Sequence, residues 1–335
     1  MKALDIGIAY ELRAELSAPA GAPIDALEEY DSPDTLDALA GSLRALGHRP
    51  RLLGGGRAFL QAALQAPPDL VFNLSEGRAT RSREAQLPAV CEMLDIPCTH
   101  SDPLAMALSL DKAMTKRVLQ SAGLRTAEFR LVEALCDIEA LDLPFPLFVK
   151  PLGEGSSMGV RTTSRVADHA ALEREVERCL RDYRQPALVE TYLGGVEATV
   201  GITGCGAGAR VLGVMEIAPA QAPVEQFVYG LESKRNWREL VRYHAPPANL
   251  TSSECADAAN VALGAYRALG CRDIARADVR FDAKGRAHFM EINPLPGINP
   301  ITGDIVVMAG LLGMNYTALV GAIVAAALAR YPQLQ

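Results

Sequence analysis

Two common nucleotide-binding signatures are absent from this 335-residue sequence. No GxGxxG fingerprint follows an expected strand, which argues against a nicotinamide-dependent enzyme. There is no Walker A motif either: the lysine of that motif follows its glycines, whereas Lys150 here precedes the Gly- and Ser-containing segment 153–159. Any nucleotide site in this chain is therefore of another kind.

Basic residues are outnumbered by acidic ones. The chain has 33 Lys and Arg against 40 Asp and Glu, a formal net charge of -7 and a pI of about 5.4. Nucleic-acid binding needs clustered positive charge to neutralise phosphates, so we expect no nucleic-acid partner. A small phosphate-bearing ligand needs only a few local cations and stays compatible with this balance.

Paired cysteine motifs are also missing. The chain has 7 cysteines, an odd number, and no two of them stand at CxxC spacing. A disulfide framework or a zinc site is therefore not expected, and free thiols suit a cytoplasmic protein.

Long apolar runs are scarce. Asp5 interrupts the first one too early for a signal peptide. The other, residues 305–329, contains Asn315, Tyr316 and Thr317, whereas a membrane span needs about 20 consecutive apolar residues. We expect a helix–turn–helix in the core there and no membrane partner; a spanning helix is the alternative.

The order of expected elements predicts an α/β fold that becomes α+β in its C-terminal half. Strands alternate with helices over 1–103, which is typical of a parallel, Rossmann-like unit. Within and after it we expect a short strand at 98–100 and one helix over 104–122. Strand-like runs dominate after 196, and segment 221–247 has the irregular pattern of a mobile lid. Three domains follow: 1–103, 104–195 and 196–335.

The strongest local chemistry lies near the end of the chain. Glu291 and Asn293 are two apart on an expected strand and so share a face, and a turn at 282–285 would pair that strand with the one carrying Asp278. Two carboxylates and an amide oxygen could hold two Mg²⁺ ions about 3.5–4 Å apart. The alternative is a surface hairpin with solvated acids.

A second candidate site begins at Lys150. This lysine ends an apolar strand, and the small residues of 153–159 after it would let backbone N–H groups approach a phosphate. The alternative is an ordinary strand–turn–strand. Lys112 at a helix start, Glu190 on a strand edge and Glu197 are weaker candidates for the same ligand.

These motifs occur in one order: LDKAMTK at 110–116, FVKP at 148–151, EGSSMGV at 154–160, GVEATV at 195–200, ARAD at 275–278 and EINPLPG at 291–297. Over about residues 104–315 the chain resembles the D-alanine–D-alanine ligase branch of the ATP-grasp enzymes. The resemblance implies an ATP-grasp fold behind an N-terminal Rossmann-like domain. It also implies an ATP- and Mg²⁺-dependent ligase that joins a carboxylate to an amine through an acyl phosphate.

The resemblance also assigns roles to residues. ATP would lie between the central and C-terminal domains, with two Mg²⁺ ions for which Mn²⁺ could substitute. Arg276 and the Gly297 N–H would stabilise the oxyanion, and the loop carrying Ser156 would close over the site. The nucleotide would be held by Lys112, Lys150, Glu154 and Ser157 near the phosphates, Glu190 and Leu193 at the adenine, and Glu197 at the ribose. The metal ligands would be Asp278, Glu291 and Asn293.

The departures from the family pattern fall on the amino-acid sites. The glycines of the family's first turn are missing, so Glu11 or Glu15 is the candidate for the first substrate's ammonium. Lys234-Arg235 replaces a Lys-Tyr pair, and Thr302 replaces a serine that grips the second substrate's carboxylate. Segment 73–77, NLSEG, stands where the family has a His-Gly sequence.

Three alternatives therefore stay open at this stage. The ligase could act on D-alanine, or on a different amino acid or a small secondary-metabolite acid. The chain could also be a non-catalytic ATP-binding sensor. The resemblance further suggests a homodimer.

Overall fold

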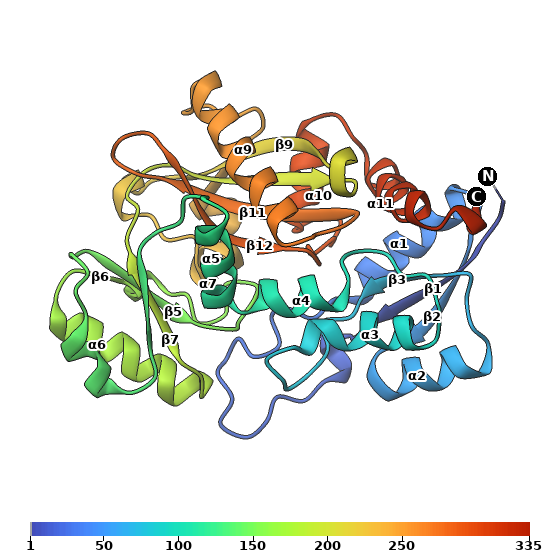
Figure 1. The fold of residues 1–335 in the computed structure, drawn as a ribbon, viewed down its shortest axis with the longest axis horizontal. Coiled ribbons are helices and arrows are strands. Elements are labelled where there is room, and N and C mark those ends of the chain that lie inside the picture. Colours follow the sequence, from blue (N-terminus) through green and yellow to red (C-terminus); the bar gives the residue numbers. More distant parts are fainter. Residues whose placement is uncertain (1) are drawn as a thin grey trace.

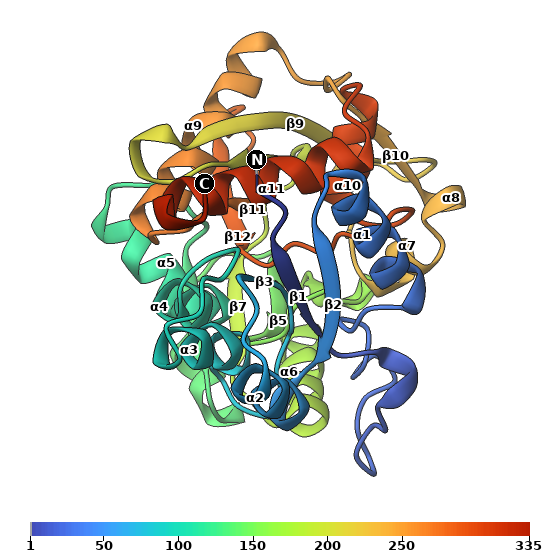
Figure 2. The same ribbon diagram turned by 90° about the vertical axis from the view of Figure 1, so that its right-hand side faces the viewer.

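A parallel sheet forms the N-terminal part of the chain. The computed structural model describes residues 2–335, and its first sheet has the order β2-β1-β3 (Figures 1 and 2). Helices cover both faces, with α1 and α11 on one and α2 and α3 on the other. The elements are β1 (Asp5–Tyr10), α1 (Pro33–Ala45), β2 (Arg49–Gly54), α2 (Gly56–Gln65), β3 (Leu70–Leu74), α3 (Gln86–Met93) and α11 (Tyr316–Arg330). The predicted parallel α/β unit is confirmed.

The middle of the chain forms a four-stranded antiparallel sheet in the order β4-β7-β5-β6. Its core joins Val149 to Leu172 and Val176, which are spaced four apart on the covering helix α6. The elements are β4 (Phe129–Val132), β5 (Leu147–Pro151), β6 (Arg165–Val166), α6 (His169–Arg178) and β7 (Ala187–Thr191). β5 therefore delivers Lys150 from a buried strand.

The third sheet has five antiparallel strands in the order β10-β9-β8-β11-β12. Helix α9 packs on it through Ala258, Ala262 and Tyr266, and begins at a capping box between Thr251 and Glu254. The elements are β8 (Glu197–Thr203), β9 (Arg210–Pro219), β10 (Val241–His244), α9 (Ser252–Ala268), β11 (Ile274–Phe281) and β12 (Ala287–Asn293).

The three sheets lie within the three segments predicted as domains, but their helices are shared. In both views α11 lies beside α1, and Ile323 of α11 belongs to the same core as Ile6 and Leu39 (Figures 1 and 2). The C-terminal segment thus completes the N-terminal core. The boundaries at 103 and 195 stay a prediction.

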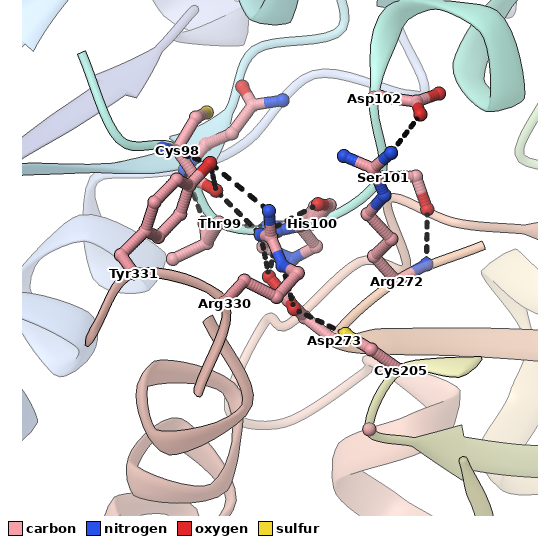
Figure 3. A network of polar contacts seen from close by, with 12 residues as sticks. Cys98, Thr99, His100, Ser101, Asp102, Cys205, Arg272, Asp273, Arg330 and Tyr331 are labelled. Atoms are coloured by element: carbon pink, nitrogen blue, oxygen red, sulfur yellow. Dashed lines mark hydrogen bonds and ion pairs between the residues drawn. The ribbon is translucent and has the colours of Figure 1, made fainter. Parts of the chain in front are cut away.

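A buried ion pair adds a polar tie to this apolar contact (Figure 3). Arg330, at the end of α11, donates to both carboxylate oxygens of Asp273, at 2.9 and 2.6 Å, and to the Cys98 carbonyl at 2.8 Å. Asp273 also accepts from the His100 backbone N–H at 2.9 Å. The segment before α4, the start of β11 and α11 are therefore fixed to one another.

Two expected elements are wrong. The helix expected over 104–122 is broken into α4 (Pro103–Leu110) and α5 (Lys112–Ser121) by Asp111, whose extended backbone (ψ 96°) ends α4 and whose side chain caps α5 through the Met114 N–H. The strand expected at 98–100 is only an isolated bridge between Val71 and Cys98. The backbone N–H groups of Cys98 and His100 donate to the side chains of Tyr331 and Asp273 instead of to a neighbouring strand.

Segment 221–247 is not featureless. It contains α7 (Leu231–Arg235) and α8 (Trp237–Leu240) and ends in β10. The expected helix–turn–helix near the C-terminus is confirmed as α10 (Asp304–Leu311) and α11. In residues 2–335 no helix on its own has the length and apolarity to span a membrane. Helices α10 and α11 meet these two criteria only when taken together, and they are bent by 111° relative to each other.

Candidate active site

Four cavities adjoin one another where the sheets meet. The first lies between β5 of the four-stranded sheet and β11 and β12 of the five-stranded sheet, and holds about 620 Å³ of space open to solvent. A side cavity continues from it along β7. A wide cavity and an acidic cavity lie on the other side, toward the N-terminal sheet. Arg276 lines the first, wide and acidic cavities, so their contents meet at this guanidinium.

Two lysines are locked together by a carboxylate beside the first cavity. Glu190 of β7 forms ion pairs of 2.8 Å with Lys150 through one oxygen and with Lys116 of α5 through the other. Burial opposes ionisation of Glu190, but the two ammonium groups outweigh it and lower its pKa to about 2. Two cations against one anion leave a net positive charge facing the cavity.

Alternation along β11 places three charged side chains on one face. Arg276, Asp278 and Arg280 are two residues apart, and all line the first cavity. The predicted hairpin is confirmed: Asp278 stands opposite Glu291 of β12, with an irregularity in the register just after Asp278. The two carboxylates therefore share the cavity wall.

Glu291 is surrounded by cations without touching them. Its carboxylate oxygens lie 3.7 Å from the Lys112 Nζ and 4.0 Å from Arg276. Burial would raise the pKa of Glu291, but Lys112, Lys150 and Arg276 lower it to about 2, so it is an anion at neutral pH.

The donor set at this wall suits a hard cation. Among residues 2–335 no group donates a hydrogen bond to the Glu291 carboxylate, and the Asn293 amide makes no side-chain hydrogen bond, so both have free oxygens. Asp278 has each oxygen bound to Arg276, at 3.1 and 2.8 Å, and retains further lone pairs. Carboxylate and amide oxygens are what Mg²⁺ prefers, so the residues fit this ion.

The expected adenine and ribose residues follow the same cavity outward. Leu193 and Glu190 line the side cavity, which shares Phe148 and Arg280 with the first. Glu197 lines the first cavity and pairs with Arg280 at 3.1 Å. Burial raises the pKa of Glu197 to about 7, although Arg280 opposes the shift.

The loop at residues 153–159, here called the serine loop, has a strained backbone. Ser156 and Ser157 have φ values of 48° and 59°, in the left-handed region, where each non-glycine residue costs on the order of 1 kcal/mol. Ser157 faces the first cavity, while Ser156 faces the wide and acidic cavities. Glu154 is held by Arg83 and by Gln185 (2.6 Å) and lines the first cavity. The loop thus forms a wall common to all three cavities.

The wide cavity contains three further predicted residues. Gly297, Thr302 and Lys234 all line it, and Lys234 also faces the first cavity. On its wall Tyr229 donates to Asp304 at 3.0 Å, and Asp304 accepts from Arg276 at 2.9 Å. Arg276 is therefore held from two sides, by Asp278 and by Asp304.

Of the other three predicted substrate residues, two lie outside these four cavities and the third is held by an ion pair. Glu11 lines none of these four cavities; its carboxylate accepts from the Ser75 hydroxyl at 2.8 Å and the Glu76 N–H at 3.1 Å. Glu15 is exposed in a short 3₁₀ turn. Arg235 lines the wide cavity but forms an ion pair with Glu28.

Sequence reasoning missed several residues of the site. Two of them carried a signal: Lys116 is four residues after Lys112, on the same helix face, and Arg280 is two residues after Asp278, on the same strand face. Asp304, Tyr229 and Glu84 had none, because nothing in their local pattern shows which distant element they face.

Two antiparallel sheets that hold a lysine- and carboxylate-lined cavity between them define an ATP-grasp protein. A D-alanine–D-alanine ligase from Bacillus anthracis, whose crystal structure holds ATP, superimposes with a TM-score of 0.73 over 99% of this chain and 100% of that one, at 18% identity. The likeness at that identity concerns the fold.

Sequence comparison identifies the family. The family model described as "D-ala D-ala ligase C-terminus" matches residues 117–325. D-alanine–D-alanine ligase from Granulibacter bethesdensis is 36% identical over 77% of this chain and 80% of its own length. The one from Bordetella petrii is 33% identical over 85% and 84%. The chain belongs to the D-alanine–D-alanine ligase family.

Membership settles the class of reaction. The protein is an ATP-dependent, ADP-forming ligase that makes an amide bond between a carboxylate and an amine, and its family uses Mg²⁺ and small amino-acid substrates. The expected ligase class and ATP-grasp fold are confirmed, and they are favoured over a non-catalytic ATP binder.

Proposed function

We propose that this chain joins the carboxylate of one amino acid to the amine of a second, and that the bond is made beside Arg276. The observation that carries this proposal is the position of Arg276, which lines the first, wide and acidic cavities at once. A nucleotide phosphate in the first cavity, an acid in the acidic cavity and an amine in the wide cavity would all reach this residue.

The first and side cavities would hold the nucleotide. Lys112 and Lys150 supply positive charge for the phosphates, helped by Glu154 and Ser157 of the serine loop, which shape the cavity wall. Glu190 and Leu193 border the adenine, and Glu197 accepts from the ribose hydroxyls. Buried cations that are already fixed in place bind a polyanion at little cost in side-chain entropy.

Asp278, Glu291 and Asn293 would hold the metal, with two Mg²⁺ ions as the proposed number and Mn²⁺ as a substitute. Bound there, Mg²⁺ would neutralise charge on the phosphate oxygens. Because Asp278 also holds Arg276, the same carboxylate positions the residue that works on the carbonyl.

Arg276 and the Gly297 N–H would act on the acyl carbonyl. The first carboxylate attacks the γ-phosphorus, ADP leaves, and the amine then attacks the resulting acyl phosphate with loss of phosphate. The tetrahedral oxyanion needs fixed donors, and Arg276 is fixed by Asp278 and Asp304. Ser156 and its loop would exclude water from the acyl phosphate.

Two versions of this reaction remain. The relatives named above are D-alanine–D-alanine ligases, and that reaction is the first candidate. The second is a ligase for a different amino acid. The observation in its favour is that Glu11, the expected ligand of the first substrate's ammonium, binds the Ser75 hydroxyl and does not line the acidic cavity. Thr302 and Lys234 are the proposed contacts for the second substrate's carboxylate in either case.

The test is Mg²⁺-dependent ADP release from ATP with a panel of D- and L-amino acids, singly and in pairs, with mass spectrometry of the product. A dipeptide mass together with ADP supports the proposal. ATP binding, seen as a raised melting temperature, without ADP release from any pair would contradict it. A cytoplasmic location and a homodimer stay predictions.

A further inference from the structure

The acidic cavity has an unusual charge for a place next to a reaction centre. Three glutamates line it, Glu29, Glu76 and Glu84, together with Arg276 and Gly297, and it holds about 470 Å³ of space open to solvent. A carboxylate that reacts beside Arg276 would have the rest of its molecule among these three acids.

Only one of the three glutamates is neutralised within the protein. Arg83 binds both oxygens of Glu29, at 3.1 and 2.8 Å. Glu76 and Glu84 make no side-chain hydrogen bond and no ion pair with any residue from 2 to 335, although Glu84 is only 8% exposed. Asn293 also points a buried amide nitrogen without a partner at this region.

Glu84 is buried and Glu76 is half-buried, and carboxylates that lose much of their contact with water without gaining an ion-pair partner are costly. An ionised group taken out of water loses several kcal/mol unless an opposite charge compensates it. Burial and the neighbouring Glu84 accordingly raise the pKa of Glu76 well above its usual range. Arg83 offsets part of this cost for both acids, but no residue from 2 to 335 forms an ion pair with either, and a cationic ligand would remove the rest.

The backbone that carries Glu76 is fixed close to the backbone next to Glu84. Glu11 accepts from Ser75 and from the Glu76 N–H and thereby fixes the loop after β3. Gly77 follows with φ 69°, and a Cβ there would collide with the Arg83 carbonyl. Only glycine lets the Glu76 loop lie directly on the backbone next to Glu84.

We propose that the acidic cavity selects a first substrate with two cationic nitrogens, a diamino carboxylic acid, one nitrogen on Glu76 and the other on Glu84. The proposal rests on the ligase reaction proposed above and deepens it. The substrate's carboxylate then lies toward Arg276 and Gly297, which line the same cavity. A monoamine such as alanine leaves one buried carboxylate without a partner.

The competing explanation is a shared proton. If one of the two carboxyls stays protonated, a single ammonium neutralises the pair, and alanine is served as well as a diamino acid. The two explanations differ in substrate preference and in the effect of removing one charge. Glu→Gln at 76 or 84 keeps the size of the side chain, removes its charge and replaces one acceptor oxygen by an NH2 donor.

The experiment compares kcat/KM for ADP release by the full chain with alanine, 2,3-diaminopropionate, 2,4-diaminobutyrate and ornithine of both hands as the acid. We expect the best diamino acid to exceed alanine by about 10²-fold or more, since a buried charge pair is worth about 2–5 kcal/mol. E76Q and E84Q should each lose about that factor with the diamino acid and little with alanine. E92Q, on the exposed face of α3, is the matched control and should change neither.

Binding gives a second readout. Calorimetry with Mg²⁺ and a non-hydrolysable ATP analogue should show the diamino acid binding to the native chain and at least tenfold more weakly to E76Q and E84Q, with melting temperatures confirming that both variants fold. Alanine preferred over every diamino acid, or variants that keep the native preference, would overturn this inference and leave the ligase proposal standing. No ADP release with any member or pair of the full panel of D- and L-amino acids would instead contradict the ligase reaction.

Discussion

The first cavity and the acidic cavity contain similar numbers of buried acids but balance them in opposite ways. Around the first cavity, Glu190 has two lysines, Glu197 has Arg280 and Glu291 has Lys112 and Arg276 nearby. Around the acidic cavity, Glu76 and Glu84 have no ion-pair partner among residues 2–335. The first cavity has enough positive charge to bind an anion. The acidic cavity has negative charge that is balanced only when a cation binds there.

This difference separates chemistry from choice of substrate. A surplus of fixed cations suits any nucleoside triphosphate. Uncompensated acids suit only a ligand of matching charge, so they set specificity by penalising the wrong ligand as much as by attracting the right one.

The largest effect is expected from Lys150→Met. Lys150 is buried beside the first cavity and pairs with Glu190, so its loss removes charge from the transferring phosphoryl group, a contribution of the kind worth about 10³-fold or more in kcat. Steady-state ADP release measures it. Lys284→Met in the exposed hairpin turn is the control, and Lys150→Arg should recover part of the rate. A loss of less than tenfold would contradict the role.

Arg276→Ala should come next. Removing one fixed oxyanion donor costs about 10²–10³-fold in turnover, while ATP affinity stays nearly unchanged because Lys112 and Lys150 remain. Measuring turnover and titrating ATP on the same preparation separates the effect on catalysis from the effect on ATP binding. Unchanged turnover would mean that Arg276 only neutralises Asp278 and Asp304, and that the oxyanion is stabilised elsewhere.

The lining of the first cavity could be foreseen from the sequence for a physical reason. Strand alternation puts Arg276 and Asp278 on one face, and a tight turn at 282–285 pairs Asp278 with Glu291, so a short stretch of sequence contains the arrangement. Lys150 similarly ends a strand that its own apolar residues predict. The parallel sheet, the hairpin and the C-terminal helix pair follow from the same local periodicities.

The acidic side could not be foreseen, because distant contacts decide it. Glu11 looked like an ammonium ligand by its place after β1, but the close approach of Gly77 to Arg83 turns the neighbouring loop so that Glu76 faces the cavity instead. The break between α4 and α5 was missed because apolar residues continue on both sides of Asp111, and only its capping of the Met114 N–H shows that a second helix begins there.

Glu84→Gln should make the protein more stable at high pH. Burial raises the pKa of Glu84 to about 7, against the opposing charge of Arg83, so the folded chain holds a proton that the unfolded chain releases near pH 4.5. Native stability therefore falls between about pH 4.5 and 7, by on the order of 3 kcal/mol for such a shift, and the variant escapes this loss.

Chemical denaturation at pH 4 and pH 8 measures this difference. The two proteins should be closely matched at pH 4, where both forms of the side chain are neutral, and the variant should be more stable at pH 8. Glu92→Gln, which is exposed, should match the native chain at both values. A variant less stable at pH 8 would show that Glu84 is already compensated, and the contrast between the cavities would disappear.

The smallest effect is expected from Arg235→Ala in α7. Arg235 binds Glu28, which also binds Arg13 at 3.2 Å, so the segment over the wide cavity is fastened to the N-terminal loop by exposed ion pairs. Such pairs contribute about 0–1 kcal/mol, which predicts a KM for the second substrate raised at most about fivefold, with kcat unchanged and the difference shrinking in high salt. Arg210→Ala, at the exposed start of β9, is the control.

A tenfold or larger rise in KM that persists in salt would mean that Arg235 leaves Glu28 and touches the substrate. The cations of the wide cavity would then bind an anionic ligand, as those of the first cavity are proposed to do. The acidic cavity alone would then select the substrate through acids that have no ion-pair partner.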